Sequence, residues 1–504
     1  MNTRKRLAAM RAAGMTQQSD AALPENPACV VGQGQRCQHV LVDSELNRRL
    51  FEYENTVRGR FSPIVDTLKT LSAFQHELDF VSRAQRVAED KLGYSLPESL
   101  LGEAWVSGLD LRALHSHCIF SSFRQSVLRA AMDRSAWMDR MAITEAFVRE
   151  CGYHTVDVSP CADGRLQGVL PFVLRMAPSD SVFVKAYAGA LFDVEGDIAD
   201  WSQRELARLS GAFSGWENTN YLKVAVYHYS TSSPGEQGCA AHGSSDNKAT
   251  QAALDRLEEL RMAIENTFGI GAAPDVLLIG MDTDTDGIRV HVPDSIGAIN
   301  PHRYVDSIAL YRDTVGQSAE EARRTIEFAV TEAENADGWA RGQGAAPSGL
   351  RSLILRLLEA NLSQIEYVIQ HHAGRYSVIG HNERFICAGE APSEVQLRNK
   401  FYFAHLDTVE EGAADMDVGI KIFTGLNIRH GLAVPVLVHF HYSSRVPGAR
   451  ERAIVRCKRV KEAVQSRYPD LTGKGLLHCQ MAISDSEGSE RCAFVEDDIE
   501  DHGH

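Results

Sequence analysis

The chain has 504 residues, of which 44% are hydrophobic and 24% are charged, and its formal net charge is −15. This length predicts about three domains of an ordinary globular protein. No apolar run is long enough to cross a membrane, and the acidic balance argues against general nucleic-acid binding. The 10 cysteines stand singly along the chain, which favours ligands, nucleophiles or core residues over a disulfide scaffold.

The first 37 residues mix small, polar and glycine positions without a hydrophobic period, and they predict a mostly disordered tail. The tail is basic on an acidic protein, and such a charge suits docking on an acidic partner. Its first basic residues are Arg4, Lys5, Arg6 and Arg11. Arg11 interrupts the only apolar stretch of the tail, so we expect no secretory signal and a reducing, cytosolic-type compartment.

Residues 38–138 show apolar positions at three- and four-residue spacing, which predicts a helical domain. The sequence "HSHC" within it contains His115, His117 and Cys118. A fourth ligand at a zinc-motif spacing is missing from the sequence around this trio, so we do not assign a metal there.

From about residue 139 strand-like segments alternate with helical ones, which predicts an α/β fold with parallel strands. Strands are expected at 153–159, 221–230 and 275–284. Helices are expected at 247–268, 318–335 and 348–372.

The C-terminal part of the chain resembles this block. "VAVYHYSTSSPG" around His228 is similar to "VLVHFHYSSRVPG" around His441, and each is followed by a helix, near 249–268 and 453–468. A strand ending in an acidic turn then follows in both places. Three matches in the same order predict a duplicated unit, with one copy at 139–383 and the other at 384–504.

The two predicted copies differ in their thiols. The nearest counterpart of Cys161 in the second copy is His405, in the pattern His405-x-Asp407, and Arg452 stands at the offset of Cys239. We therefore expect the second copy to be degenerate and without metal.

The stretch "DVSPCADGRLQGVLP" ends an apolar strand and then presents Cys161, Asp163 and Arg165 at alternate positions. Alternate residues of extended chain share a face, so the three side chains can line one site. His228 ends another predicted strand and Cys239 directly precedes a predicted helix, whose dipole favours a thiolate. Two thiolates and one imidazole are a catalytic zinc set with the fourth position open.

His242 competes with His228 for the imidazole position. The end of a strand is the usual place for a ligand in an α/β sheet, which favours His228 and leaves His242 as a supporting partner or a cap.

Asp163 and Arg165 have a predicted role beside this zinc. A carboxylate two residues from a metal thiolate is able to enter the fourth position, and a bidentate Arg165 would hold it back. Asp163 would then accept a hydrogen bond from the attacking water and orient it.

This pattern is similar to the zinc site of β-type carbonic anhydrases, although those enzymes place the second pair as His-x-x-Cys, whereas His228 and Cys239 are farther apart. The longer stretches "SPCADGRLQGVLP", "GCAAHGS", "DTDTDGIRVHVPDS" and "NLSQIEYVI" resemble more specifically the carboxysome shell carbonic anhydrases, a divergent β-like group once given its own ε class.

The resemblance implies a helical N-terminal domain, a zinc catalytic domain and a degenerate C-terminal copy. It implies Zn²⁺ on Cys161, His228 and Cys239, with Asp163 and Arg165 as the catalytic pair. His381, in "GHNER", becomes a candidate for proton transfer.

The resemblance also bears on substrates, partners and place in the cell. It implies that CO2 and bicarbonate are the substrates. It implies as well that the tail tethers the enzyme to Rubisco or to the inner face of the α-carboxysome shell, and that the chain forms dimers or larger assemblies.

Two other functions stay open from the residues alone. A structural zinc scaffold would recruit His242 as its fourth ligand, and a zinc hydrolase would act on another small electrophile. "DTDTDG" begins like a calcium loop at Asp282, but its twelfth position is Pro293 instead of Glu, so we expect no calcium there.

Overall fold

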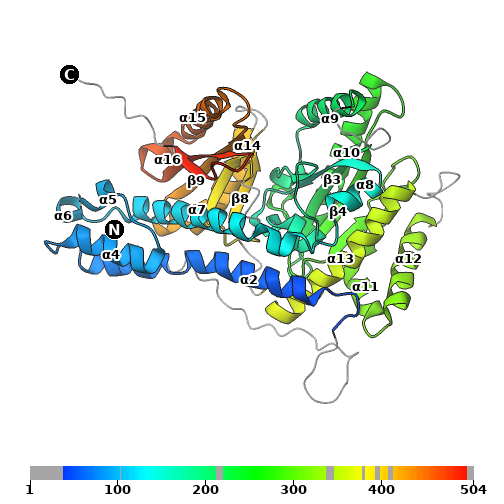
Figure 1. Cartoon of the computed structure of the whole chain (residues 1–504), viewed down its shortest axis with the longest axis horizontal. Coiled ribbons are helices and arrows are strands. Elements are labelled where there is room, and N and C mark those ends of the chain that lie inside the picture. Colours follow the sequence, from blue (N-terminus) through cyan, green and yellow to red (C-terminus); the bar gives the residue numbers. More distant parts are fainter. Residues whose placement is uncertain are drawn as a thin grey trace, which may run out of the picture. The chain divides into compact units, whose positions relative to one another are not determined.

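The computed structural model describes residues 38–102, 104–211, 220–335, 346–376, 381–391, 398–406 and 412–495 (Figure 1). The chain divides into two compact units. The described residues of the first unit are 53–134 and 381–495, and those of the second are 38–52 and 135–376. The predicted disordered tail, residues 1–37, lies outside the described residues. None of the described helices is long and apolar enough to span a membrane.

The N-terminal region is helical, as the spacing of apolar residues predicts. Its helices are α2 (Ser44–Phe61), α3 (Ile64–Ala73), α4 (Phe80–Leu92), α5 (Glu98–Gly102), α6 (Ala104–Ser107) and α7 (Leu111–Met138). The helix α4 shows the pattern clearly, because Phe80, Ala84 and Ala88 are buried on one face. It ends at Gly93, whose φ of 79° is the left-handed conformation that glycine adopts without strain.

The second unit contains the first sheet along the chain. This sheet has six strands in the order β2-β1-β3-β4-β5-β6. The strands are β1 (Tyr153–Pro160), β2 (Val182–Val184), β3 (Asn220–Tyr229), β4 (Asp275–Asp282), β5 (Ile288–His291) and β6 (Val305–Asp306). The first four in that order are parallel, and β5 and β6 pair antiparallel. The sheet is therefore mixed, and the three strands predicted from the sequence are confirmed.

Helices surround this sheet. They are α8 (Glu145–Glu150), α9 (Val194–Leu209), α10 (Asp246–Phe268), α11 (Ser307–Thr314), α12 (Ala319–Asn335) and α13 (Ser348–His372). The three predicted helices are confirmed as α10, α12 and α13. One detail differs: Cys239 precedes only the short turn η4 (Ala240–His242), because α10 starts later, where Ser245 caps it.

The first unit contains the second sheet along the chain. This sheet has five strands in the order β11-β10-β9-β7-β8. Its strands are β7 (Phe385–Gly389), β8 (Phe401–His405), β9 (Val434–Tyr442), β10 (Leu477–Asp485) and β11 (Ala493–Val495). Its helices are α14 (Gly412–Leu426), α15 (Ala449–Arg467) and α16 (Pro469–Gly473). Phe123 of α7 packs on this sheet, with its ring 4.7 Å from that of Phe385.

Five strands of the six-stranded sheet correspond in order to those of the five-stranded sheet, and β6 has no counterpart among the described residues. The order β2-β1-β3-β4-β5 matches β8-β7-β9-β10-β11, and both end in an antiparallel strand. The N–H of Cys161 donates to the carbonyl of Val226, two residues before His228. The N–H of Glu390 donates in the same way to His439, two residues before His441. Glu390 therefore occupies the place of Cys161, and the expectation of His405 is wrong because its strand, β8, stands where β2 does.

A cluster of buried charges joins α9 to the first sheet. Nζ of Lys223, on β3, lies 3.1 Å from Oδ2 of Asp157, on β1, and also contacts the carboxylate of Asp197 on α9. Nζ of Lys185 lies 3.0 Å from Oδ1 of Asp197. Lys223 and Asp157 are both fully buried. Buried charges are tolerated only when they are paired, so each member depends on the others.

We expect Lys223→Met to lower the free energy of unfolding of this unit by about 3–5 kcal/mol, because two buried carboxylates would then share Lys185 alone. The thermal unfolding midpoint of the full-length chain measures the effect. Lys248→Met, the same change at an exposed position, serves as the control and should leave the midpoint nearly unchanged. Equal midpoints for the two variants would contradict the assigned role of the cluster.

Candidate metal centre

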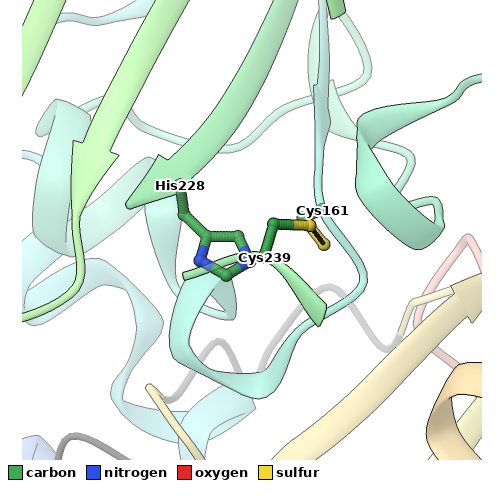
Figure 2. A group of neighbouring side chains, drawn as sticks. All are labelled: Cys161, His228 and Cys239. Carbon is green, nitrogen blue, oxygen red and sulfur yellow. Dashed lines mark hydrogen bonds between the residues drawn. The ribbon is translucent and has the colours of Figure 1, made fainter. Parts of the chain in front are cut away.

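Three side chains from different elements converge at the carboxyl edge of the first sheet. Cys161 follows β1, His228 lies near the end of β3, and Cys239 precedes η4 (Figure 2). Their potential ligand atoms all lie within 4.8 Å of one another, and all three residues are buried. The parallel pairing of β1 with β3 brings the first two together, since parallel strands end at the same edge.

The donor set fits zinc. The Sγ atoms of Cys161 and Cys239 are 3.8 Å apart. Two sulfurs bound tetrahedrally at about 2.3 Å from zinc would themselves be about 3.8 Å apart. Within the described structure neither ring nitrogen of buried His228 has a hydrogen-bond partner, an arrangement that suits a metal ligand. The three residues therefore form a group that can bind a metal and leave a fourth position open.

The two thiols influence each other's ionisation. The pKa of Cys161 is raised well above its ordinary value by its hydrogen bond to Cys239 and by burial. The pKa of Cys239 is lowered by the same hydrogen bond and, against the effect of burial, by the N–H groups of Ala241 and His242. The pair therefore favours the state in which one sulfur is protonated and the other is a thiolate. Binding of a divalent cation would favour deprotonation of both sulfurs.

His242 lies outside the ligand group. Its Nε2–H donates to the carbonyl oxygen of Gly189 at 3.0 Å. The N–H of Gly189 in turn donates to Sγ of Cys161 at 3.3 Å. Gly189 has a φ of 69°, and a Cβ there would lie 2.6 Å from Nε2 of His242, so the close approach requires glycine. The histidine thus supports the segment that contacts the Cys161 sulfur.

Asp163 is held by Arg165 in a bidentate ion pair. Oδ1 of Asp163 accepts from both the backbone N–H and Nε of Arg165 at 2.9 Å, and Oδ2 accepts from Nη2 at 2.7 Å. Nη1 of Arg165 donates to the carbonyl of Gln237 at 2.6 Å, and Nη2 also reaches that of Gly238 at 3.3 Å. Arg165 is 1% exposed and Asp163 is 3% exposed, so the pair is shielded from bulk water.

The restrained carboxylate lies directly beside the ligand group. Oδ2 of Asp163 is 3.7 Å from Nε2 of His228. The alternation Cys161-x-Asp163-x-Arg165 thus brings a sulfur ligand, a carboxylate and its guanidinium partner to one place, although η1 (Gly164–Leu166) replaces extended chain after Asp163. Sequence reasoning missed the main-chain groups of Gly189, Gln237 and Gly238, which leave no side-chain signal.

His381 belongs to the other unit, where its Nδ1 lies 3.0 Å from Oε1 of buried Glu383. Its role in proton transfer stays a prediction. His115, His117 and Cys118 lie on α7. Burial lowers the pKa of His115 to about 3, with Arg384 and His478 acting in the same direction, and lowers that of His117 to about 4.

The equivalent place in the second sheet holds an internal ion cluster. Oε2 of Glu390 accepts from the N–H of His441 at 2.7 Å, and Oε1 lies 3.1 Å from Nη1 of Arg456 on α15. Nη2 of Arg456 donates to the carbonyl of Leu406 at 3.1 Å. Burial opposes ionisation, but hydrogen bonding to His441 and the charge of Arg456 hold the pKa of Glu390 at about 2. A guanidinium thus lies where the first sheet brings a metal-binding group together.

Comparison with known proteins matches nearly the whole chain. Three family models align in succession: Carboxysome Shell Carbonic Anhydrase, N-terminal, over residues 39–131, the catalytic domain over 143–381, and the C-terminal domain over 382–499. The ligand group and its acid–guanidinium pair all fall within the match to the catalytic domain.

Curated relatives agree with this match. The carboxysome shell carbonic anhydrase of Halothiobacillus neapolitanus is 44% identical over 471 residues, which are 93% of this chain and 92% of the relative. That of Prochlorococcus marinus is 44% identical over 476 residues, 92% and 89% of the two chains. That of Hydrogenovibrio crunogenus is 40% identical over 455 residues, which are 89% of this chain and 84% of the relative. The chain therefore belongs to the carboxysome shell carbonic anhydrase family and is, by that membership, a carbonic anhydrase.

Proposed function

We propose that this carbonic anhydrase is zinc-dependent, with Cys161, His228 and Cys239 as ligands, and that it interconverts CO2 and bicarbonate. The observation that carries the proposal is a buried S,N,S ligand group, whose two sulfurs have the spacing expected for tetrahedral zinc, beside a carboxylate that is paired with Arg165. Zinc supplies the Lewis acidity that lets water act as a nucleophile near neutral pH.

The surrounding residues orient the reactants. Arg165 engages both oxygens of Asp163, and this keeps the carboxylate from closing the fourth position. Asp163 accepts a hydrogen bond from the attacking water, so that a lone pair of the water points toward the carbon of CO2. The product is bicarbonate and one proton. We assign the outward movement of that proton to His381 or to buffer, as the sequence predicts.

We further propose that the two sheets arose by duplication and that the second copy lost its metal. The matching strand order and the equivalent registers of Cys161 and Glu390 support a common origin. In the second copy Arg456 supplies the positive charge that balances Glu390, and the arrangement needs no ion.

The relatives' names place those proteins in the carboxysome shell, and we propose the same compartment for this chain. There it would supply CO2 to Rubisco. The basic residues of the N-terminal 37 support an electrostatic tether to Rubisco or to the inner shell face. A homodimer or larger assembly stays a prediction.

A structural zinc protein is the alternative function. It would need a fourth protein ligand, and the sequence offers His242 for that position. The hydrogen bond from His242 to Gly189 favours a supporting role instead.

Replacement of the Asp163 carboxylate tests the proposed mechanism. We expect Asp163→Asn to lower the rate of CO2 hydration by roughly 10²–10³-fold, because the attacking water loses its acceptor. Zinc content should stay near that of the wild type. Stopped-flow hydration and metal analysis measure both, with Asp180→Asn, at an exposed position of the same unit, as the control. Full activity of the Asp163 variant would contradict the assigned role.

Replacement of His242 distinguishes a zinc site with three protein ligands from a structural site with four. His242→Gln should retain both zinc and hydration, since glutamine still donates to the Gly189 carbonyl and is a poor zinc ligand. His228→Gln should lose zinc. If His242→Gln loses its zinc as well, the four-ligand structural site becomes the better explanation.

Removal of residues 1–37 tests the tether. We expect the remaining chain to hydrate CO2 at the wild-type rate and to lose its association with Rubisco, measured by co-sedimentation. Changing Arg4, Lys5, Arg6 and Arg11 to Glu in the full chain should reproduce the loss if charge carries the attraction. Undiminished association of the truncated chain would exclude the tail as the tether.

A further inference from the structure

The acidic turn that begins at the last residue of β4 contacts the segment that connects two of the proposed zinc ligands. This turn contains Asp282, Asp284 and Asp286, which are all buried. The connecting segment, residues 229–238, runs from His228 to Cys239. The turn does not provide a ligand to the Cys161–His228–Cys239 group, so its buried carboxylates have no part in the mechanism described above.

Asp284 makes a dense set of contacts with the start of this segment. Its Oδ2 accepts from the backbone N–H of Ser232 at 2.6 Å and from Oγ of Ser230 at 3.1 Å. Oγ1 of Thr231 lies 3.2 Å from this oxygen and 2.9 Å from Oδ2 of Asp282, so the two carboxylates share that hydroxyl. Asp284 is 1% exposed. A buried carboxylate that accepts several hydrogen bonds holds its donors more firmly than a neutral acceptor does.

Further hydrogen bonds continue from these donors to the metal centre. Oγ of Ser230 accepts from the N–H of Ser233, whose carbonyl accepts from the N–H of Gln237. The carbonyl of Gln237 is the acceptor for Nη1 of Arg165. The segment then continues to Cys239. Its conformation therefore determines both the place of one sulfur ligand and the partner of the Arg165 guanidinium.

The second sheet provides an internal comparison for this turn. Asp485, at the end of β10, accepts from the N–H of Ser444 at 3.0 Å, just as Asp282 accepts from that of Thr231 at 3.1 Å. This contact is common to both sheets and therefore belongs to the fold. In the place of Asp284 stands Glu487, whose Oε1 accepts from Oγ of Ser443 at 3.4 Å but whose Oε2 pairs with the side chain of exposed Arg445 at 2.6 Å.

We propose that Asp284 is a positioning residue of the metal centre, which acts by fixing the segment that delivers Cys239 and the carbonyl partners of Arg165. This inference rests on the proposed zinc centre. The contact made by Asp282 recurs in the second sheet and therefore belongs to the fold. The hydrogen bond from the N–H of Ser232 to Asp284 is found in the sheet that has the thiol ligands.

The test is metal affinity of the full-length chain. We expect Asp284→Asn to weaken Zn²⁺ binding by roughly 10–100-fold, the usual effect of removing a partner that orients ligands. Competition with a chromophoric chelator measures the affinity. Binding of Co²⁺ alone adds a spectroscopic readout, since a displaced Cys239 sulfur alters the thiolate-to-cobalt absorption. Glu487→Gln, the same chemical change at the equivalent turn, should leave affinity and spectrum unchanged.

A second variant covers the case in which Asp284→Asn does not fold. Ser230→Ala removes a hydroxyl that donates to the carboxylate of Asp284, so it should weaken metal binding in the same direction by less. Wild-type affinity and cobalt spectrum in the folded variants would overturn the inference. Failure of the wild-type chain to bind either metal would instead overturn the proposed zinc centre.

Discussion

The pairing of β1 with β3 is the constraint on which the site depends. The bond from the N–H of Cys161 to the Val226 carbonyl continues this parallel register one residue beyond the strand, and it places Cys161 near His228 at one edge of the sheet. A shift of one residue would send each side chain to the opposite face. The buried pair of Lys223 and Asp157 joins the same two strands, so the ligand geometry and the core ion cluster rely on a common alignment.

Main-chain groups complete what the side chains begin. The N–H of Gly189 contacts one sulfur, and the carbonyls of Gln237 and Gly238 receive the guanidinium of Arg165. Buried polar groups need such partners, because unpaired ones carry the full cost of desolvation. The segments around the site must therefore be held rigidly, and this requirement explains the dense hydrogen bonding of the acidic turn that begins at the last residue of β4.

The second sheet shows how the same framework can exist with an internal ion pair. Glu390 stands at the register of Cys161, and Arg456 brings a permanent positive charge to it from α15. The carboxylate and guanidinium neutralise each other, whereas two thiolates need a divalent cation for the same purpose. The proposed difference between the copies thus comes down to which group supplies positive charge at the sheet edge.

The sequence by itself determined much of this protein, because periodicity and strand-end motifs are local. It predicted β1, β3, β4 and α10, the repeat of a β-α-β pattern, and the three side chains that the structure brings within 4.8 Å. Only the tertiary structure decided which strand lies beside β9. That strand is β7, and for this reason Glu390 and not His405 is the counterpart of Cys161. It also separated His228 from His242 and brought Asp284 to the segment before Cys239, since those contacts join residues far apart in the chain through groups that no local pattern encodes.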